Sequence, residues 1–186
     1  AEGLRHVWPD GLGSSSGELG CNAIDHHFRV GATGSVEGYL DRIVIGRRPG
    51  GFYIPRYRNL FGDKRDYLRG FGYQGAAART GWEREVPELG IGAPLKEALG
   101  EPGPWIIGMT GFGETLPYHD NRIFLDRSRK DKWGLPVLAM DCSIRENEHR
   151  MRKDMQDDAA EMLEAAGIKN VRKTNNGYNF GRSKFN

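Results

Sequence analysis

Residues 143–167 read SIRENEHRMRKDMQDDAAEMLEAAG, and this stretch decides the fold of the chain. Apolar side chains recur along it at helical spacing, at Met151, Met155, Ala159, Met162 and Ala166, while charged residues fill the other positions. Ser143 and Glu146 have the spacing of a capping box, and Gly167 is placed to end the helix in the left-handed region. The stretch predicts a helix over residues 144–166 whose methionine stripe packs on a sheet.

The segments before this helix have the alternation and the turn residues of strands. We expect strands at residues 25–30, 40–45, 52–54, 67–80, 105–113, 122–125 and 137–141, and a short helix at 94–99. The glycine turns between early strands favour antiparallel pairing of neighbours in sequence. Residues 1–20 are turn-rich and irregular, and no linker divides the remainder. These features predict one domain over residues 1–186, of the α+β class, with a twisted antiparallel sheet and helices packed on one face.

Composition narrows the classes of protein. Of 186 residues, 38% are hydrophobic and 28% charged, and the formal net charge is only +2. This balance argues against a dedicated nucleic-acid binder, and no apolar run is long enough for a membrane helix. The first residues lack the basic start and apolar run of a signal peptide, so we expect a cytoplasmic protein. Cys21 and Cys142 lie far apart, and we expect buried filler rather than a disulfide or a metal pair.

Two local patterns suggest cofactor or metal binding, but the residues around them argue against both sites. Residues 70–75 read GFGYQG, which fits the dinucleotide pattern G-x-G-x-x-G. No apolar strand precedes it and no long helix follows it, so we expect a glycine-rich strand instead. His26 and His27 would face opposite sides of a strand and cannot grip one ion, and we expect no metal site.

Arginines and aromatic residues interleave between residues 42 and 69, in the manner of single-stranded nucleic-acid platforms. The set comprises Arg47, Arg48, Phe52, Tyr53, Arg56, Tyr57, Arg58, Arg65, Tyr67 and Arg69. Aspartates dilute the charge, so solvated arginines on hairpin edges are the expected outcome. A single-stranded RNA-binding module stays open as an alternative function.

Several stretches resemble the glucose–methanol–choline (GMC) oxidoreductases, especially their pyranose-oxidase-like bacterial branch. Residues 17–27, GELGCNAIDHH, are similar to the family segment Gly-x-Asn-Leu-x-Asp-His, with Ala23 where the family often has Leu. Residues 113–126, GETLPYHDNRIFLD, and 132–137, KWGLPV, are similar to the family's late hairpin. Residues 46–49 and 53–56 suit the same branch, and the long helix follows in the expected place.

The resemblance implies the substrate-binding domain of an FAD-dependent enzyme that oxidises a sugar or alcohol CH–OH group. The family's flavin-binding Rossmann unit and its catalytic His-x-x-Gly segment have no counterpart in these residues, so no catalytic residue is assigned. FAD is expected in the complete enzyme and not on this chain alone, which would need the missing flavin domain or a partner chain. A truncated remnant without function is a further alternative.

The same resemblance suggests site residues. Asn22, Asp25 and His26 are expected near the cofactor, although His26 is equally expected as a core histidine. Arg56, Glu114 and Tyr118 are expected to contact substrate. For Arg56, a surface salt bridge is the competing expectation.

Overall fold

The computed structural model describes residues 6–9, 11–42, 51–80, 91–100 and 102–177. After a 3-10 turn, η2 (Ser14–Ser16), the chain forms seven strands and two helices among these residues. The strands are β1 (His26–Val36), β2 (Gly51–Ile54), β3 (Phe71–Arg79), β4 (Trp105–Glu114), β5 (Arg122–Lys130), β6 (Pro136–Asp141) and β7 (Lys169–Asn175). The helices are α1 (Ala93–Gly100) and α2 (Glu146–Ala165). The expected α+β class is confirmed.

The chain divides into two compact units. We call Phe28–Gly113 together with Arg150–Gly177 the sheet unit. The described residues up to His27, together with Glu114–His149, form the hairpin unit. No described helix is long and apolar enough to cross a lipid bilayer.

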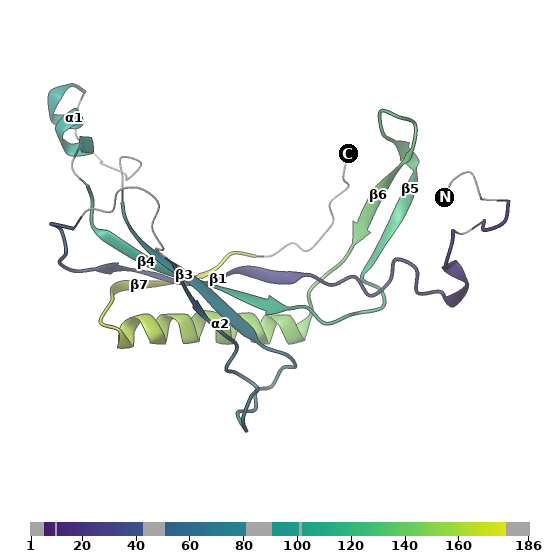
Figure 1. The fold of residues 1–186 in the computed structure, drawn as a ribbon, viewed down its shortest axis with the longest axis horizontal. Helices are drawn as coiled ribbons and strands as arrows, with labels where there is room; N and C mark the ends of the chain where they lie inside the picture. The colour runs from purple at the N-terminus through teal and green to yellow at the C-terminus, as the bar shows by residue number, and fades with distance from the viewer. Residues whose placement is uncertain (1–5, 10, 43–50, 81–90, 101, 178–186) are drawn as a thin grey trace. The chain divides into compact units, whose positions relative to one another are not determined.

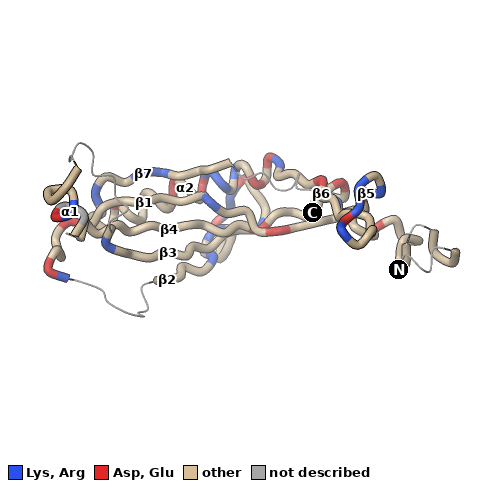
Figure 2. The backbone as a smooth tube through the Cα atoms, turned by 90° about the horizontal axis from the view of Figure 1, so that it is seen from above, with Lys and Arg blue, Asp and Glu red and all other residues tan. Residues whose placement is uncertain are grey.

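The sheet unit is built on five antiparallel strands in the order β2-β3-β4-β1-β7, which lie side by side in Figure 2. β3 and β4 pair along their whole length, from Phe71 opposite Gly113 to Arg79 opposite Trp105. β7 closes the edge by pairing with β1. The first and last thirds of the sequence therefore meet in one sheet.

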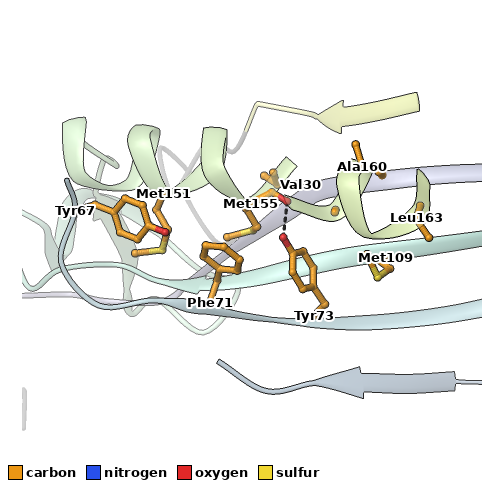
Figure 3. Close-up of a cluster of buried hydrophobic side chains, with 11 residues drawn as sticks. Val30, Tyr67, Phe71, Tyr73, Met109, Met151, Met155, Ala160 and Leu163 are labelled. Carbon is orange, nitrogen blue, oxygen red and sulfur yellow. Dashed lines mark hydrogen bonds between the residues drawn. The ribbon is translucent and has the colours of Figure 1, made fainter. Parts of the chain in front are cut away.

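Helix α2 lies along one face of this sheet (Figure 1). Met151, Met155 and Ala159 are fully buried there, which confirms the predicted stripe. The phenol of Tyr73 donates a 2.6 Å hydrogen bond to the backbone carbonyl of Met155, shown as a dashed line in Figure 3. Phe71 packs edge-on against Tyr73, with ring centroids 5.4 Å apart.

The C-terminal cap of α2 is the one that the sequence predicts, whereas the N-terminal cap uses a different residue. Gly167, at φ 80°, ends the helix as predicted, and Ile168 donates its N–H to the Leu163 carbonyl in the bond typical of a glycine cap. Ala166 is exposed, and Leu163 belongs to the core instead. At the start, the capping carboxylate is that of Glu148, which accepts the backbone N–H of Arg145 at 2.8 Å.

Several predicted strands need correction. Leu40 and Asp41 form a turn and not the start of a strand, and residues 43–45 lie outside the described part. β1 and β5 extend well beyond their predicted ends. The predicted pairing of sequential early strands is wrong for β1, whose neighbours are β4 and β7. β7 was not predicted, because residues 169–175, KNVRKTN, show no apolar alternation.

In the hairpin unit, β5 and β6 form a two-stranded antiparallel sheet with Arg122 opposite Asp141. The residues 126–130, predicted as part of a charged loop, continue β5 instead. Val137 and Ala139 are buried as expected, whereas Leu138 between them is 43% exposed. β6 therefore keeps one covered side, whereas no residue of β5 is buried.

Candidate functional site

The sheet face opposite α2 carries a polar row, and we call this side the open face. On β3 and β4 its residues alternate with the core residues Tyr73 and Met109. Tyr53 pairs with Gln74, and Gln74 pairs with Thr110, in the register of β2, β3 and β4. A phenol, an amide and a hydroxyl therefore stand side by side across three strands.

The exposure and chemistry of this row suit a polar ligand. Tyr53 is 64% exposed, Gln74 is exposed and Thr110 is half-buried. Their groups both donate and accept hydrogen bonds, and none carries a charge at neutral pH. Such a set can bind the hydroxyl groups of an alcohol or a sugar.

An aromatic pair lies beside the polar row. The rings of Phe28 and Phe112 stack with centroids 5.9 Å apart and planes at 13°. Phe112 follows Thr110 by two residues on β4 and therefore shares its face. Opposite Phe112, Gly72 leaves room for the Tyr53 ring, because a Cβ at Gly72 would lie 3.1 Å from the Tyr53 oxygen. The open face thus joins hydrogen-bonding groups to a flat apolar wall.

The three residues predicted to lie near the cofactor are all in the hairpin unit. Asn22 has a left-handed backbone at φ 55° and donates a 2.6 Å hydrogen bond to Glu18. Asp25 accepts the backbone N–H of His26 at 2.7 Å. His26 itself is 72% exposed, so the alternative of a core histidine is wrong for this residue. The fully buried histidine is His27, as expected for neighbours on one strand.

Glu114 and Tyr118, predicted to contact substrate, also belong to the hairpin unit. Glu114 ends β4, and the N–H of the next residue, Thr115, binds the Asp25 carbonyl at 3.2 Å. Tyr118 donates its hydroxyl to Glu148, 3.0 Å from Oε2. Burial and this hydrogen bond raise the pKa of Tyr118 to about 12. Its phenol is therefore a neutral group at physiological pH.

Glu148 organises the segment that carries Tyr118. Its carboxylate is fully buried and also accepts the backbone N–H of Leu116 at 3.0 Å and of Arg145 at 2.8 Å. Burial alone would raise the pKa of Glu148, but these hydrogen bonds outweigh it and hold the pKa below its ordinary value. A charged, fully satisfied carboxylate thus ties the start of α2 to residues 116–118.

Arg56 belongs to the sheet unit, in the loop between β2 and β3, which we call the β2–β3 loop (residues 55–70). Its guanidinium donates to the carbonyls of Arg58 at 3.1 Å and Asn59 at 3.2 Å. The competing expectation of a salt bridge is not met within the described residues, because Arg56 faces no carboxylate there. Arg56 instead lines a cavity of about 460 Å³ formed by this loop.

Four of the ten arginine and aromatic residues of the RNA alternative contact carboxylates of helix α2. Tyr57, Arg58 and Tyr67 bind carboxylates of α2, and Arg65 lies 3.5 Å from the carboxylate of Asp154. Arg47 and Arg48 lie outside the described residues. The Tyr57 and Tyr67 rings are thus occupied inside the protein and are not offered for base stacking.

Sequence reasoning missed Gln74, Thr110 and Glu148. The alternation in 71–75 and 109–113 carries a signal for the first two, since each stands between residues of the core face. Their neighbour relationship depends on strand order, which no local pattern gives. For Glu148 the signal is its position three residues after Arg145, where a carboxylate can cap a helix.

No protein-family model matches the chain. Among curated proteins, the chain is 30% identical over 152 residues to the 2-methyl-1,2-propanediol dehydrogenase of Mycolicibacterium austroafricanum. The match covers 75% of this chain and 26% of that dehydrogenase. The chain therefore spans about a quarter of the length of the curated relative that it matches. By sequence, it is a distant relative of one part of a dehydrogenase named for an alcohol.

Proposed function

We propose that the chain is the substrate-binding part of a GMC-type, FAD-dependent oxidoreductase that oxidises a CH–OH group of an alcohol or sugar. The similarity to part of a diol dehydrogenase is the observation that carries the proposal. The quoted segments at residues 17–27, 113–126 and 132–137, in family order, support the same assignment. The open face supplies a surface of the right chemistry.

In this proposal the open face forms one wall of the substrate cavity. Tyr53, Gln74 and Thr110 bind substrate hydroxyls, while Phe28 and Phe112 pack on its carbon skeleton. These groups are neutral, so they orient the substrate and exclude water without holding the proton that leaves the hydroxyl. Their contribution is to specificity, through contacts that a wrong alcohol fails to make.

The described residues do not fit the flavin cofactor. Pyrophosphate binding needs a glycine turn between a strand and a helix N-terminus, and residues 70–75 run into β3 instead. FAD, which accepts hydride from the substrate carbon when bound, is assigned to the rest of a longer protein or to a partner chain. Asn22, Asp25 and His26 are proposed to border it, and Glu114 and Tyr118 to border the substrate.

The test compares two preparations. One contains this chain together with all coding sequence that flanks it in its gene, or with a co-expressed flavoprotein partner. The other is the 186-residue chain alone. We expect the first to be yellow and to lose its flavin absorbance when 2-methyl-1,2-propanediol or another alcohol is added without oxygen. The chain alone should stay colourless.

Either of two results would contradict the proposal. The chain alone could bind FAD stoichiometrically, or the complete product could fold and still show neither flavin nor alcohol oxidation. A panel of small diols and monosaccharides, tested at equal concentration, separates an alcohol oxidase or dehydrogenase from a sugar-oxidising enzyme.

A further inference from the structure

The β2–β3 loop is fixed to helix α2 by charged hydrogen bonds. Asp158, only 6% exposed, accepts Nε of Arg58 at 2.7 Å and the hydroxyl of Tyr57 at 2.6 Å. Asp154 accepts the hydroxyl of Tyr67 at 2.6 Å. In Figure 1 the loop, drawn in slate blue between β2 and β3, extends past α2. Hydrogen bonds to α2 therefore hold this protruding loop of the sheet unit in place.

The loop is also braced from within by one side chain. Asn59 donates from Nδ2 to the carbonyls of Tyr67 and Arg69, each at 2.9 Å. Its Oδ1 accepts the backbone N–H of Arg65 at 2.7 Å. These three bonds join the two ends of the loop across ten residues. The shape of its surface is thus set before any partner binds, which lowers the entropy cost of binding.

Unpaired positive charge lines the cavity in this loop. Its volume is about 460 Å³, and four cationic side chains and one acidic side chain are among those that line it. The acid, Asp63, is already paired with Arg58 and Arg65. Within the described part of the chain, Lys64 and Arg56 face no carboxylate. The surface therefore favours a ligand that brings negative charge.

Apolar side chains stand at the rim of the same cavity. Phe61 is completely exposed, and Leu68 is 66% exposed. Phe61 also has a left-handed backbone at φ 51°, a conformation that costs about 1–3 kcal/mol for a bulky residue. Exposure and strain at one aromatic residue suggest that its role lies outside the folding of this chain.

We propose that the β2–β3 loop is a docking surface for an acidic protein segment that carries an apolar side chain. Carboxylates of the partner would pair with Arg56 and Lys64, and its apolar group would pack on Phe61 and Leu68. The choice of a protein over a small molecule follows from the exposed rim, which would leave most of a small ligand in water, whereas small-molecule sites bury most of it. Aromatic and arginine side chains are also the usual anchors of protein interfaces. Arg56 then serves docking, in place of the substrate contact expected from the sequence.

The test uses three dye-labelled twelve-residue peptides and the full chain, with binding read by fluorescence anisotropy. The first peptide alternates Glu and Leu, the second Lys and Leu, and the third Glu and Ser. We expect the Glu/Leu peptide to bind at least about tenfold more tightly than either of the others, because it alone offers both negative charge and apolar contact. Raising the salt concentration should weaken the binding of the Glu/Leu peptide, because salt screens the charges.

Variants locate the site. Lys64→Glu should lower the affinity for the Glu/Leu peptide about tenfold or more, because it places in the cavity a charge of the same sign as the peptide's glutamates. Phe61→Asn should weaken it at least about fivefold while leaving the fold intact, because Asn tolerates the left-handed backbone. Lys169→Glu on β7, at the opposite edge of the sheet, makes the same charge change and should have no effect.

Three results would overturn the proposal. The first is that the Glu/Leu peptide binds Lys64→Glu and Phe61→Asn as tightly as it binds the wild-type chain. The second and third are that a single-stranded RNA, or vesicles of anionic phospholipid, bind the wild-type chain more tightly than the peptide does and lose that binding in Lys64→Glu. Flavin content and alcohol oxidation are separate readouts, so failure here is distinguishable from failure of the proposed enzyme function.

Discussion

Arg58 and Asp158 form a two-bond ion pair between the β2–β3 loop and helix α2. Arg58 Nε lies 2.7 Å from Asp158 Oδ2, and Nη2 lies 2.6 Å from Oδ1. The two residues are 100 positions apart in the sequence. Because Asp158 is only 6% exposed, the pair is shielded from solvent on the helix side. Parallel bonds of this kind fix geometry as well as adding stability.

Asp158→Asn should destabilise the protein by about 3 kcal/mol, because it removes the two-bond partner of Arg58 and leaves its guanidinium only the longer 3.6 Å ion pair with Asp63. Asp157→Asn is the matched control on the same helix, since Asp157 pairs with Lys153 and Lys173 at the surface. We expect the control to lose about 1 kcal/mol or less in the free energy of unfolding. Urea unfolding curves measure both changes, and equal losses in the two variants would contradict this account of the pair.

The sequence predicts the long helix well because its periodicity is local. Met151 and Met155 recur at helical spacing, and Gly167 ends the helix as its position indicates. β7 is different, since Val171 is the sole apolar residue of KNVRKTN. It forms a strand because β1 offers an edge to pair with, which is a tertiary effect that overrides local preference.

The candidate site follows the same division. That Gln74 faces away from Tyr73 is readable from alternation along one strand. That Gln74 stands between Tyr53 and Thr110 depends on the order β2-β3-β4 and on its register. The family resemblance suggested six site residues, and most of them lie in the hairpin unit. The open face therefore depends on the order and register of the strands, which the local sequence does not predict.

The stability of the hairpin unit should depend on pH through Glu148. Its pKa is lowered in the folded protein, so its ionised form stabilises the fold above the unfolded value of 4.5. That contribution is lost as pH falls from 4.5 through the lowered folded pKa. Glu148→Gln should cost about 2 kcal/mol at neutral pH and flatten the decline in acid.

The control for this prediction is Glu161→Gln, an exposed carboxylate on the same helix. It should follow the wild-type pH profile of the unfolding free energy. If Glu148→Gln also follows that profile, with no loss at neutral pH, the hydrogen bonds to Leu116 and Arg145 do not stabilise the fold as described.

Gly31 tests how closely β1 and β4 approach. A Cβ at Gly31 would collide with the backbone carbonyl oxygen of Met109, which cannot move aside as a flexible side chain could. Gly38 also has a positive φ, but a Cβ there would meet nothing within 4 Å. Gly31→Ala should therefore lower the unfolding free energy by about 2 kcal/mol more than Gly38→Ala. Similar losses in thermal or urea unfolding would show that the strands are farther apart than described.

Phe61→Asn should raise stability while it removes the proposed anchor. Asn adopts a left-handed backbone more readily than Phe, so we expect a gain of about 0.5–1 kcal/mol in the free energy of unfolding. Leu68→Asn, at an exposed position of the same rim outside the left-handed region, should bring no gain. A loss of stability in Phe61→Asn would mean that the aromatic ring packs within this chain.

Steady-state kinetics with Gln74→Ala and Thr110→Val combined, in the flavin-containing protein proposed above, show whether the open face forms a wall of the substrate site. If it does, KM for the preferred alcohol rises about tenfold or more while kcat changes little, because the row binds substrate without holding the transferred proton. Gln156→Ala on α2, which lies on the other face of the sheet, should leave both constants unchanged. An unchanged KM in the double variant, with the fold intact, would contradict this role of the open face.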